Sequence, residues 1–151
     1  MPLELGATAP AFTAKDTHGN TVSLSDFAGK PVVLYFYPKD DTPGCTKQAC
    51  GFRDSYQQYL SKGIAVLGVS LDDEASHKAF TDKYSLPFPL LADTDGSITK
   101  AYDVEGERNG VRYAQRVTYL LAPDGKISQV YGAGTVNTDT HASDVLVALG
   151  A

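Results

Sequence analysis

One stretch decides the fold of this chain: Pro31-Val32-Val33-Leu34-Tyr35-Phe36-Tyr37. It is β-branched, aliphatic or aromatic throughout, which is typical of a strand that is buried on both faces. A second apolar run spans residues 64–71, after a segment with helical periodicity. Two buried strands joined through a helix indicate an α/β fold.

The segments that follow these strands predict helices. Residues 45–62 have helical periodicity that stops at Gly63, and their apolar side chains are expected to share one face: Phe52, Tyr56, Tyr59 and Leu60. Residues 73–84 form a second helical segment, whose inward side chains are expected to be Ala75, Ala79 and Phe80. A short helix is predicted over residues 97–102.

The remaining segments complete the expected sheet. Residues 115–121 and 126–131 flank Pro123-Asp124-Gly125, which predicts a hairpin. A last helix is expected to follow Thr138 or Thr140 and to end at Leu149.

Near the amino terminus, His18-Gly19-Asn20 is a turn signal that precedes a short alternating segment over residues 21–24. A helical turn capped by Ser25 is predicted to follow it. The whole chain, residues 1–151, is therefore interpreted as one α/β domain with a central mixed sheet flanked by helices and an N-terminal β extension. This pattern is compatible with a thioredoxin-like architecture.

Composition excludes several classes of function. The net charge is -5, from 13 basic and 18 acidic residues, and the basic residues are not clustered, which argues against nucleic acid or an anionic membrane as a partner. No apolar run reaches the ~18 residues that a membrane span requires. The first residues lack the basic start and apolar core of a secretory signal, so we expect a cytoplasmic location.

The loop over residues 38–44 leads from the first buried strand to Cys45, which is expected at the start of a helix. Unsatisfied backbone N–H groups and the positive end of the helix dipole favour a thiolate at such a position. Thr42 can place a hydroxyl beside the sulfur, and Pro38 and Pro43 stiffen the loop. A structural alternative is that Cys45 is a small apolar residue filling a strand–helix junction.

The second cysteine, Cys50, lies five residues farther along the same predicted helix. Five helical residues advance about 7.5 Å, so the two Cα atoms are expected about 8 to 9 Å apart, beyond the ~7 Å limit for a disulfide. A direct bond would require the first helical turns to unwind, and Gly51 would ease that step. Cys50 could otherwise be an apolar residue on a buried helix face.

The pattern Pro38, Thr42, Cys45 and Cys50 resembles the atypical two-cysteine peroxiredoxins, in the branch called bacterioferritin comigratory protein or peroxiredoxin Q. The resemblance covers nearly the whole chain, including residues 6–12, 68–70, 86–96 and 116–120. It departs at Gln48, where a glutamate is common in this branch, so the charge balance near the site is expected to differ.

The resemblance implies a thioredoxin-like fold and a role for each matching residue. Cys45 would be the peroxidatic thiolate, Cys50 the resolving thiol, Thr42 a donor to sulfur and substrate, Pro38 a shield, and Arg116 a support for the thiolate that polarises the peroxide. From spacing alone, Arg116 would be read as a solvated strand charge. The implied substrates are hydrogen peroxide and organic hydroperoxides, and the implied reductant is thioredoxin, or else glutaredoxin. A monomer or weak homodimer without cofactor or metal is expected.

Other polar residues suggest no separate site. His18, His77 and His141 are widely spaced and share no metal-ligand spacing with the cysteines, so no zinc site is expected. Asp40-Asp41 and Asp72-Asp73-Glu74 are interpreted as loop and helix-cap charges.

Two other functions remain open at this point. A disulfide oxidoreductase would want a Cys-x-x-Cys motif, which the chain lacks. A redox-sensing binding module could use Cys45 and Cys50 as a switch without sustained turnover.

Overall fold

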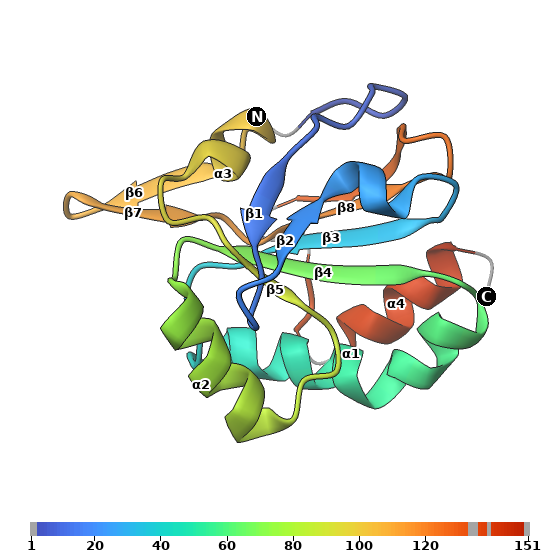
Figure 1. Cartoon of the computed structure of the whole chain (residues 1–151). Coiled ribbons are helices and arrows are strands. Elements are labelled where there is room, and N and C mark those ends of the chain that lie inside the picture. The colour runs from blue at the N-terminus through green and yellow to red at the C-terminus, as the bar shows by residue number, and fades with distance from the viewer. Residues whose placement is uncertain (1–2, 133–135, 139, 150–151) are drawn as a thin grey trace.

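A central sheet with helices on both faces organises the computed structural model of the chain, which describes residues 3–132, 136–138 and 140–149 (Figure 1). The sheet contains seven strands in the order β2-β1-β5-β4-β3-β8-β9. Their bounds are β1 Thr13–Lys15, β2 Thr21–Ser23, β3 Val32–Phe36, β4 Ala65–Ser70, β5 Leu90–Ala92, β8 Val117–Leu121 and β9 Ile127–Tyr131. β3 pairs in parallel with β4 and antiparallel with β8, so the expected mixed sheet is confirmed.

The helices divide between the two faces of this sheet. α1 (Pro43–Ser61), α2 (Glu74–Tyr84) and α4 (His141–Ala148) cover one face, whereas α3 (Ser97–Ala101) lies toward the other (Figure 1). A 3-10 turn, η1 (Leu24–Phe27), follows β2. It begins two residues earlier than expected, because a turn capped by Ser25 would have started at residue 26. Within the described residues, no helix is both long and apolar enough to cross a membrane.

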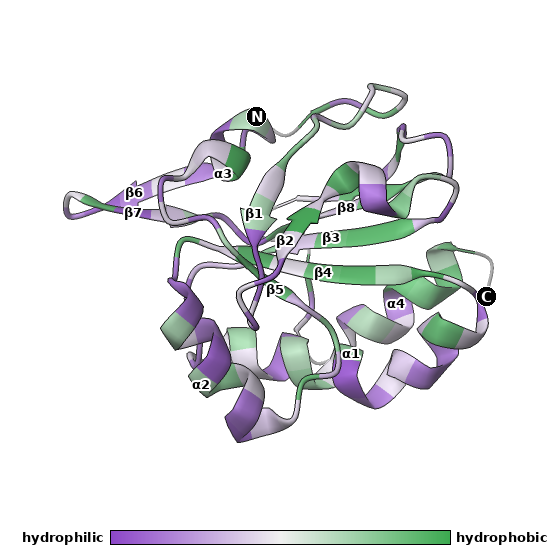
Figure 2. Cartoon of the chain, in the orientation of Figure 1, coloured by the Kyte–Doolittle hydropathy of each residue, from purple (hydrophilic) through white to green (hydrophobic). Residues whose placement is uncertain are grey.

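β3 has the burial that its sequence predicts. All five of its residues are buried, and successive side chains alternate between the faces of the sheet. Val33, Tyr35 and Tyr37 belong to the apolar layer under α1, α2 and α4. Leu34 and Phe36 belong to the layer on the opposite face. Figure 2 shows β3 and β4 as predominantly hydrophobic, whereas α2 carries hydrophilic residues along much of its length.

Three details of the helices differ from the expectation. Leu60 is 51% exposed, although Phe52 and Tyr59 on the same helix are buried. Ala75 and Ala79 of α2 are exposed, because this helix turns His77, Phe80 and Thr81 toward the sheet instead.

A second, two-stranded sheet was not predicted. It pairs β6 (Glu105–Arg108) with β7 (Val111–Ala114) and extends away from the central sheet (Figure 1). The predicted hairpin of β8 and β9 is confirmed. At α4, Thr140 is the N-cap residue, but its hydroxyl donates to Asp144 Oδ2 at 2.9 Å instead of accepting a backbone N–H.

Candidate active site

Cys45 lies in the first turn of α1, just beyond the loop that leaves the carboxyl end of β3. Pro43 takes the first helical position, where its missing N–H costs nothing and its fixed φ suits the helix. Thr42 is the N-cap, with extended backbone. The helix therefore begins two residues earlier than predicted, and Cys45 remains where the helix dipole favours an anion. Its side chain belongs to the core beneath α1 and is only 2% exposed.

Arg116 reaches Cys45 from a distant part of the chain. Its Nη2 donates to Cys45 Sγ at 3.3 Å. The sheet explains the approach: Val117 of β8 pairs with Phe36 of β3, so the residue before Val117 lies beside the loop that follows β3. A permanently charged guanidinium is thereby held next to the sulfur.

Gln48 fixes the other side of the guanidinium. Its Oε1 accepts a hydrogen bond from Arg116 Nη1 at 2.8 Å, and the side chain is buried. Because an amide is neutral, this contact orients Arg116 without opposing its charge. The Gln48 Nε2 atom is buried and has no hydrogen-bond partner among the described residues.

Gly44 is a site residue that sequence reasoning treated only as part of a turn. A Cβ atom placed on it would lie 3.1 Å from Arg116 Nη2, tighter than an ordinary contact. The absence of a side chain therefore gives the guanidinium its path to Cys45. Gly44 ends the loop over residues 38–44, but nothing in the sequence indicates which group approaches it.

Thr42 and Pro38 flank this arrangement, and in the described part of the chain neither of them hydrogen-bonds to the sulfur. The Thr42 hydroxyl donates to the Lys39 carbonyl oxygen at 2.9 Å, within the loop. Pro38 is half-buried, two residues beyond the end of β3. The contact of Thr42 with sulfur and the shielding by Pro38 stay predictions.

Cys50 has a different environment from Cys45. It is half-buried and lies on the same uninterrupted helix, and both thiols are free. The five-residue helical spacing keeps the two Cα atoms about 8 to 9 Å apart, too far for a disulfide. A bond between them would require the start of α1 to open.

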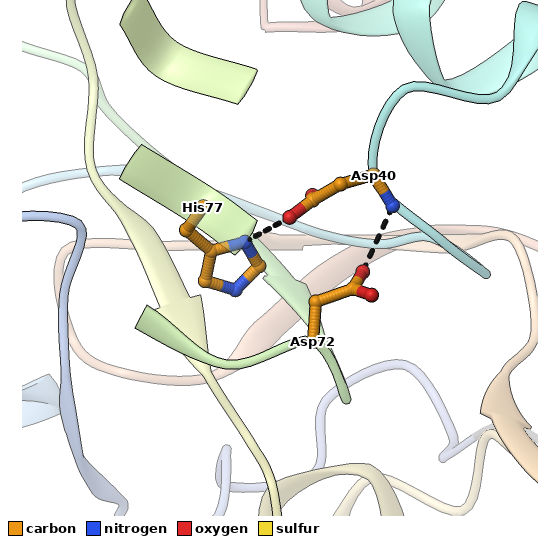
Figure 3. A group of neighbouring side chains, drawn as sticks. All are labelled: Asp40, Asp72 and His77. Carbon is orange, nitrogen blue, oxygen red and sulfur yellow. Dashed lines mark hydrogen bonds and ion pairs between the residues drawn. The ribbon is translucent and has the colours of Figure 1, made fainter. Parts of the chain in front are cut away.

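Asp40 lies in the loop, as interpreted from the sequence, but its side chain is buried. Its side chain accepts hydrogen bonds from the Tyr37 hydroxyl at 2.5 Å and from the Ser76 hydroxyl at 2.8 Å. Figure 3 shows Asp40 facing both His77 and Asp72. His77 Nδ1 lies 2.7 Å from Asp40 Oδ2, and the Asp40 backbone N–H donates to Asp72 Oδ2 at 2.8 Å.

Asp40, Asp72 and His77 together could form a metal site, since their candidate ligand atoms lie within 4.8 Å of one another. Each of them is nevertheless engaged in hydrogen bonds within the protein, and Asp72 Oδ2 also accepts from the Ser70 hydroxyl. We therefore treat Asp40, Asp72 and His77 as a hydrogen-bonded unit. The neighbouring Asp73 caps α2 by accepting from the Ser76 N–H, so the cap interpretation of that residue is confirmed.

Comparison with known proteins identifies the family of the chain. The model of the family described as AhpC/TSA matches residues 5–130. The chain belongs to the AhpC/TSA family.

Several members of the AhpC/TSA family are similar over most of the chain. Peroxiredoxin Q, chloroplastic, of Triticum aestivum is 54% identical over 126 residues, which make up 83% of this chain but 58% of the wheat protein. A Coxiella burnetii protein named peroxiredoxin bcp is 45% identical over 150 residues, covering 97% of this chain and 98% of that protein.

Among solved structures, the bacterioferritin comigratory protein of Xanthomonas campestris superposes with a TM-score of 0.86 at 37% identity, covering 98% of this chain and 96% of that one. The structure of that protein was studied to explain its alkyl peroxide reduction activity. The predicted resemblance and the thioredoxin-like fold are both confirmed.

Proposed function

We propose that this chain is a thiol-dependent peroxidase that reduces hydrogen peroxide and organic hydroperoxides through Cys45. The observation that carries the proposal is the 3.3 Å contact between Arg116 Nη2 and Cys45 Sγ at the start of α1. It joins a nucleophile to a fixed positive charge. The reduction of alkyl peroxides named for the Xanthomonas campestris relative supports the same chemistry here.

The first step is attack by the Cys45 thiolate on one peroxide oxygen. The O–O bond breaks, the attacked oxygen joins sulfur as a sulfenic acid, and the other oxygen leaves as hydroxide or alkoxide and takes up a proton. The negative charge moves from sulfur to the leaving oxygen. A guanidinium with several N–H donors beside the sulfur can stabilise both ends of that transfer, provided that it is held in place. Gln48 Oε1 provides that support.

The second step joins the two cysteines. The Cys50 thiol condenses with the Cys45 sulfenic acid, which forms one S–S bond and releases water. Because both residues lie in one continuous helix, this step requires local opening of α1. A dithiol protein then reduces the disulfide by thiol exchange, and we propose thioredoxin in this role, with glutaredoxin as the other candidate.

A coupled assay tests the function. NADPH oxidation is followed with thioredoxin reductase, thioredoxin and the wild-type chain, using hydrogen peroxide and cumene hydroperoxide as substrates. Sustained consumption that scales with the chain's concentration is expected. Consumption of a single equivalent of peroxide would instead indicate a redox sensor. The absence of any reaction with either peroxide would overturn the proposal.

The cellular setting of this activity is also a proposal. We propose a cytoplasmic monomer or weak homodimer that contributes to antioxidant defence. The wheat relative is named chloroplastic, so fractionation of the source cells is the measurement that decides the location.

A further inference from the structure

The loop over residues 38–42 controls where Cys45 stands relative to Arg116. It joins the end of β3 to the start of α1, and Asp41 within it has a left-handed backbone with φ of 58°. That conformation is unfavourable for a residue with a side chain unless contacts elsewhere maintain it. The contacts that hold this loop therefore bear on the reaction.

Asp40 is the buried anchor of the loop. The Tyr37 hydroxyl, the Ser76 hydroxyl and His77 all contact its carboxyl group. Two of these three partners belong to α2, some 36 residues farther along the chain. α2 is thus tied to the loop at a point five residues before Cys45.

His77 connects this anchor to the sheet. The side chain is fully buried, with Nε2 2.9 Å from the Leu91 carbonyl oxygen of β5. A carbonyl oxygen only accepts, so Nε2 carries a hydrogen and donates it. On the other side of the ring, Nδ1 lies 2.7 Å from Asp40 Oδ2. His77 therefore spans from β5 to the loop through two directed hydrogen bonds.

We propose that His77 is a positioning residue for the reaction at Cys45, acting through Asp40 to hold the loop and the start of α1 where Arg116 reaches the sulfur. This inference rests on the proposed peroxidase function. Displacement of a reacting group by about 1 Å can cost about 100-fold in rate. If the buried contacts of Asp40 were lost, the loop could be displaced in this way, because its remaining side-chain contacts with α2 are exposed.

Those exposed contacts lie at the far end of α2. Asp41 accepts from Lys83 Nζ at 2.8 Å and from the Tyr84 hydroxyl at 2.9 Å. Arg53 of α1 donates from Nη1 to the Tyr84 carbonyl oxygen at 2.9 Å. α2 thus contacts the chain both before Cys45 and after Cys50. We expect these contacts to confine the opening of α1 during disulfide formation to the residues between them, 42–52.

Two replacements at one position separate positioning from simple core packing. In His77→Asn the amide can occupy the place of Nδ1 and keep the contact with Asp40, but it loses Leu91. In His77→Gln the amide can occupy the place of Nε2 and keep Leu91, but it loses Asp40. Apart from a long 3.4 Å contact between Nδ1 and the Tyr37 hydroxyl, each variant gives up one buried hydrogen bond, so their thermal stabilities should be similar. Lys78→Ala, which removes the exposed pair with Asp82 on the same helix, is the control.

The measured quantity is the second-order rate constant for oxidation of Cys45 by hydrogen peroxide, from competition with a haem peroxidase. We expect His77→Gln to lower it at least tenfold, His77→Asn to stay within threefold of wild type, and Lys78→Ala to leave it unchanged. Equal rate constants in the Gln and Asn variants, whether both normal or both reduced in parallel with thermal stability, would overturn the inference.

A second pair of variants, at Asp40, tests the same role in case substitutions at position 77 prevent folding. Asp40→Asn can donate to a neutral His77 and accept from Tyr37, whereas Asp40→Ala can do neither. The same ordering is expected, with Asp40→Asn much the faster of the two, and equal rates would again contradict it. If the wild-type chain itself consumes no peroxide, the proposed function fails first; if it does and the pairs do not separate, only the role of His77 fails.

Discussion

The first and second turns of α1 hold the two cysteines in contrasting ways. Cys45 is buried, receives a hydrogen bond from Arg116, and follows a loop anchored in the core by Asp40. Cys50 is half-buried and is followed by Gly51, where a Cβ would come no closer than 3.7 Å to Ala142. Contacts with other parts of the chain hold the first turn and its thiol in place, whereas the second turn is followed by a glycine, which weakens a helix.

This difference assigns the two chemical steps different structural requirements. Attack on peroxide depends on fixed geometry between sulfur and guanidinium. Disulfide formation depends on the loss of helical geometry, because the folded helix keeps the Cα atoms of the two cysteines too far apart. A variant should therefore affect one step or the other according to the turn that it alters.

The largest expected effect is at the first turn. Cys45→Ser should abolish peroxide reduction, because a hydroxyl at neutral pH is not an effective nucleophile toward peroxide. Cys50→Ser should still consume one equivalent of peroxide but turn over poorly with thioredoxin. Peroxide consumption and sulfenic acid trapping measure both. Turnover by Cys45→Ser at the wild-type rate would remove the distinction between the turns.

Next in size is the loss of the guanidinium. Arg116→Ala should lower the rate constant for Cys45 oxidation about 100-fold or more, as removal of a preorganised donor does in other enzymes. Stopped-flow or competition kinetics measure it. The control is Arg112→Ala, an exposed arginine whose Nη2 donates to the Asp95 carbonyl oxygen on another part of the surface. Arg116 would lose its assignment if both variants reacted at similar rates.

Acidification should affect the part of α1 that lies beyond Cys50. Burial, helped by the nearby charge of Arg116 and opposed by Asp144, lowers the pKa of His141 from 6.5 to about 4. A depressed pKa in the folded state means that the neutral form stabilises the fold above pH 6.5, and that this contribution is lost as pH falls toward 4. The loss reaches about 2 kcal/mol by pH 5.

His141 packs edge-on against Phe52 of α1 and contacts the Thr118 hydroxyl at 2.9 Å, so its protonation should loosen α4 from α1 beyond Cys50. Denaturant unfolding at pH 7 and pH 5 measures the effect, with His141→Gln as the variant that cannot titrate. The wild type should lose about 2 kcal/mol more than the variant between those pH values. An identical loss in both proteins would show that other groups dominate.

The smallest effects come from the two glycines of α1. Gly44→Ala should slow oxidation of Cys45 roughly fivefold, because its Cβ forces Arg116 to shift by a few tenths of an ångström. Gly51→Ala should leave oxidation unchanged and slow disulfide formation about fivefold, since alanine stabilises a helix interior by about 1 kcal/mol over glycine. Rapid-quench measurement of each step tests the pair. Similar effects of both substitutions on the same step would break the comparison.

Much of the fold could be predicted because local pattern specifies it. β3 is continuously apolar and is buried on both faces, and Gly63 follows the end of α1 as expected, although the helix begins at Pro43, two residues earlier than predicted. The β6–β7 hairpin was missed although Asn109-Gly110 has positive φ at both residues, as tight hairpin turns require. Its flanking strands are mostly exposed, so no hydrophobic alternation marked them.

The site was predictable only as far as it is local. Cys45 could be assigned from the loop and helix start around it. The burial of Asp40 could not, because its partners Ser76 and His77 lie on α2 and only the tertiary fold brings them together. The contact of Arg116 with Cys45 depends in the same way on the pairing of β3 with β8, and only family resemblance indicated it.

That pairing has a consequence for the synthesis of the chain. Cys45 and Arg116 are 71 residues apart, so the ribosome completes the thiol and its helix long before the guanidinium exists. Until β8 is made and docks beside β3, the sulfur of a nascent chain lacks its charged partner and should react as an ordinary thiol. Under the proposed mechanism, sensitivity to peroxide thus arises only once the protein is nearly finished, which spares unfinished chains from oxidation.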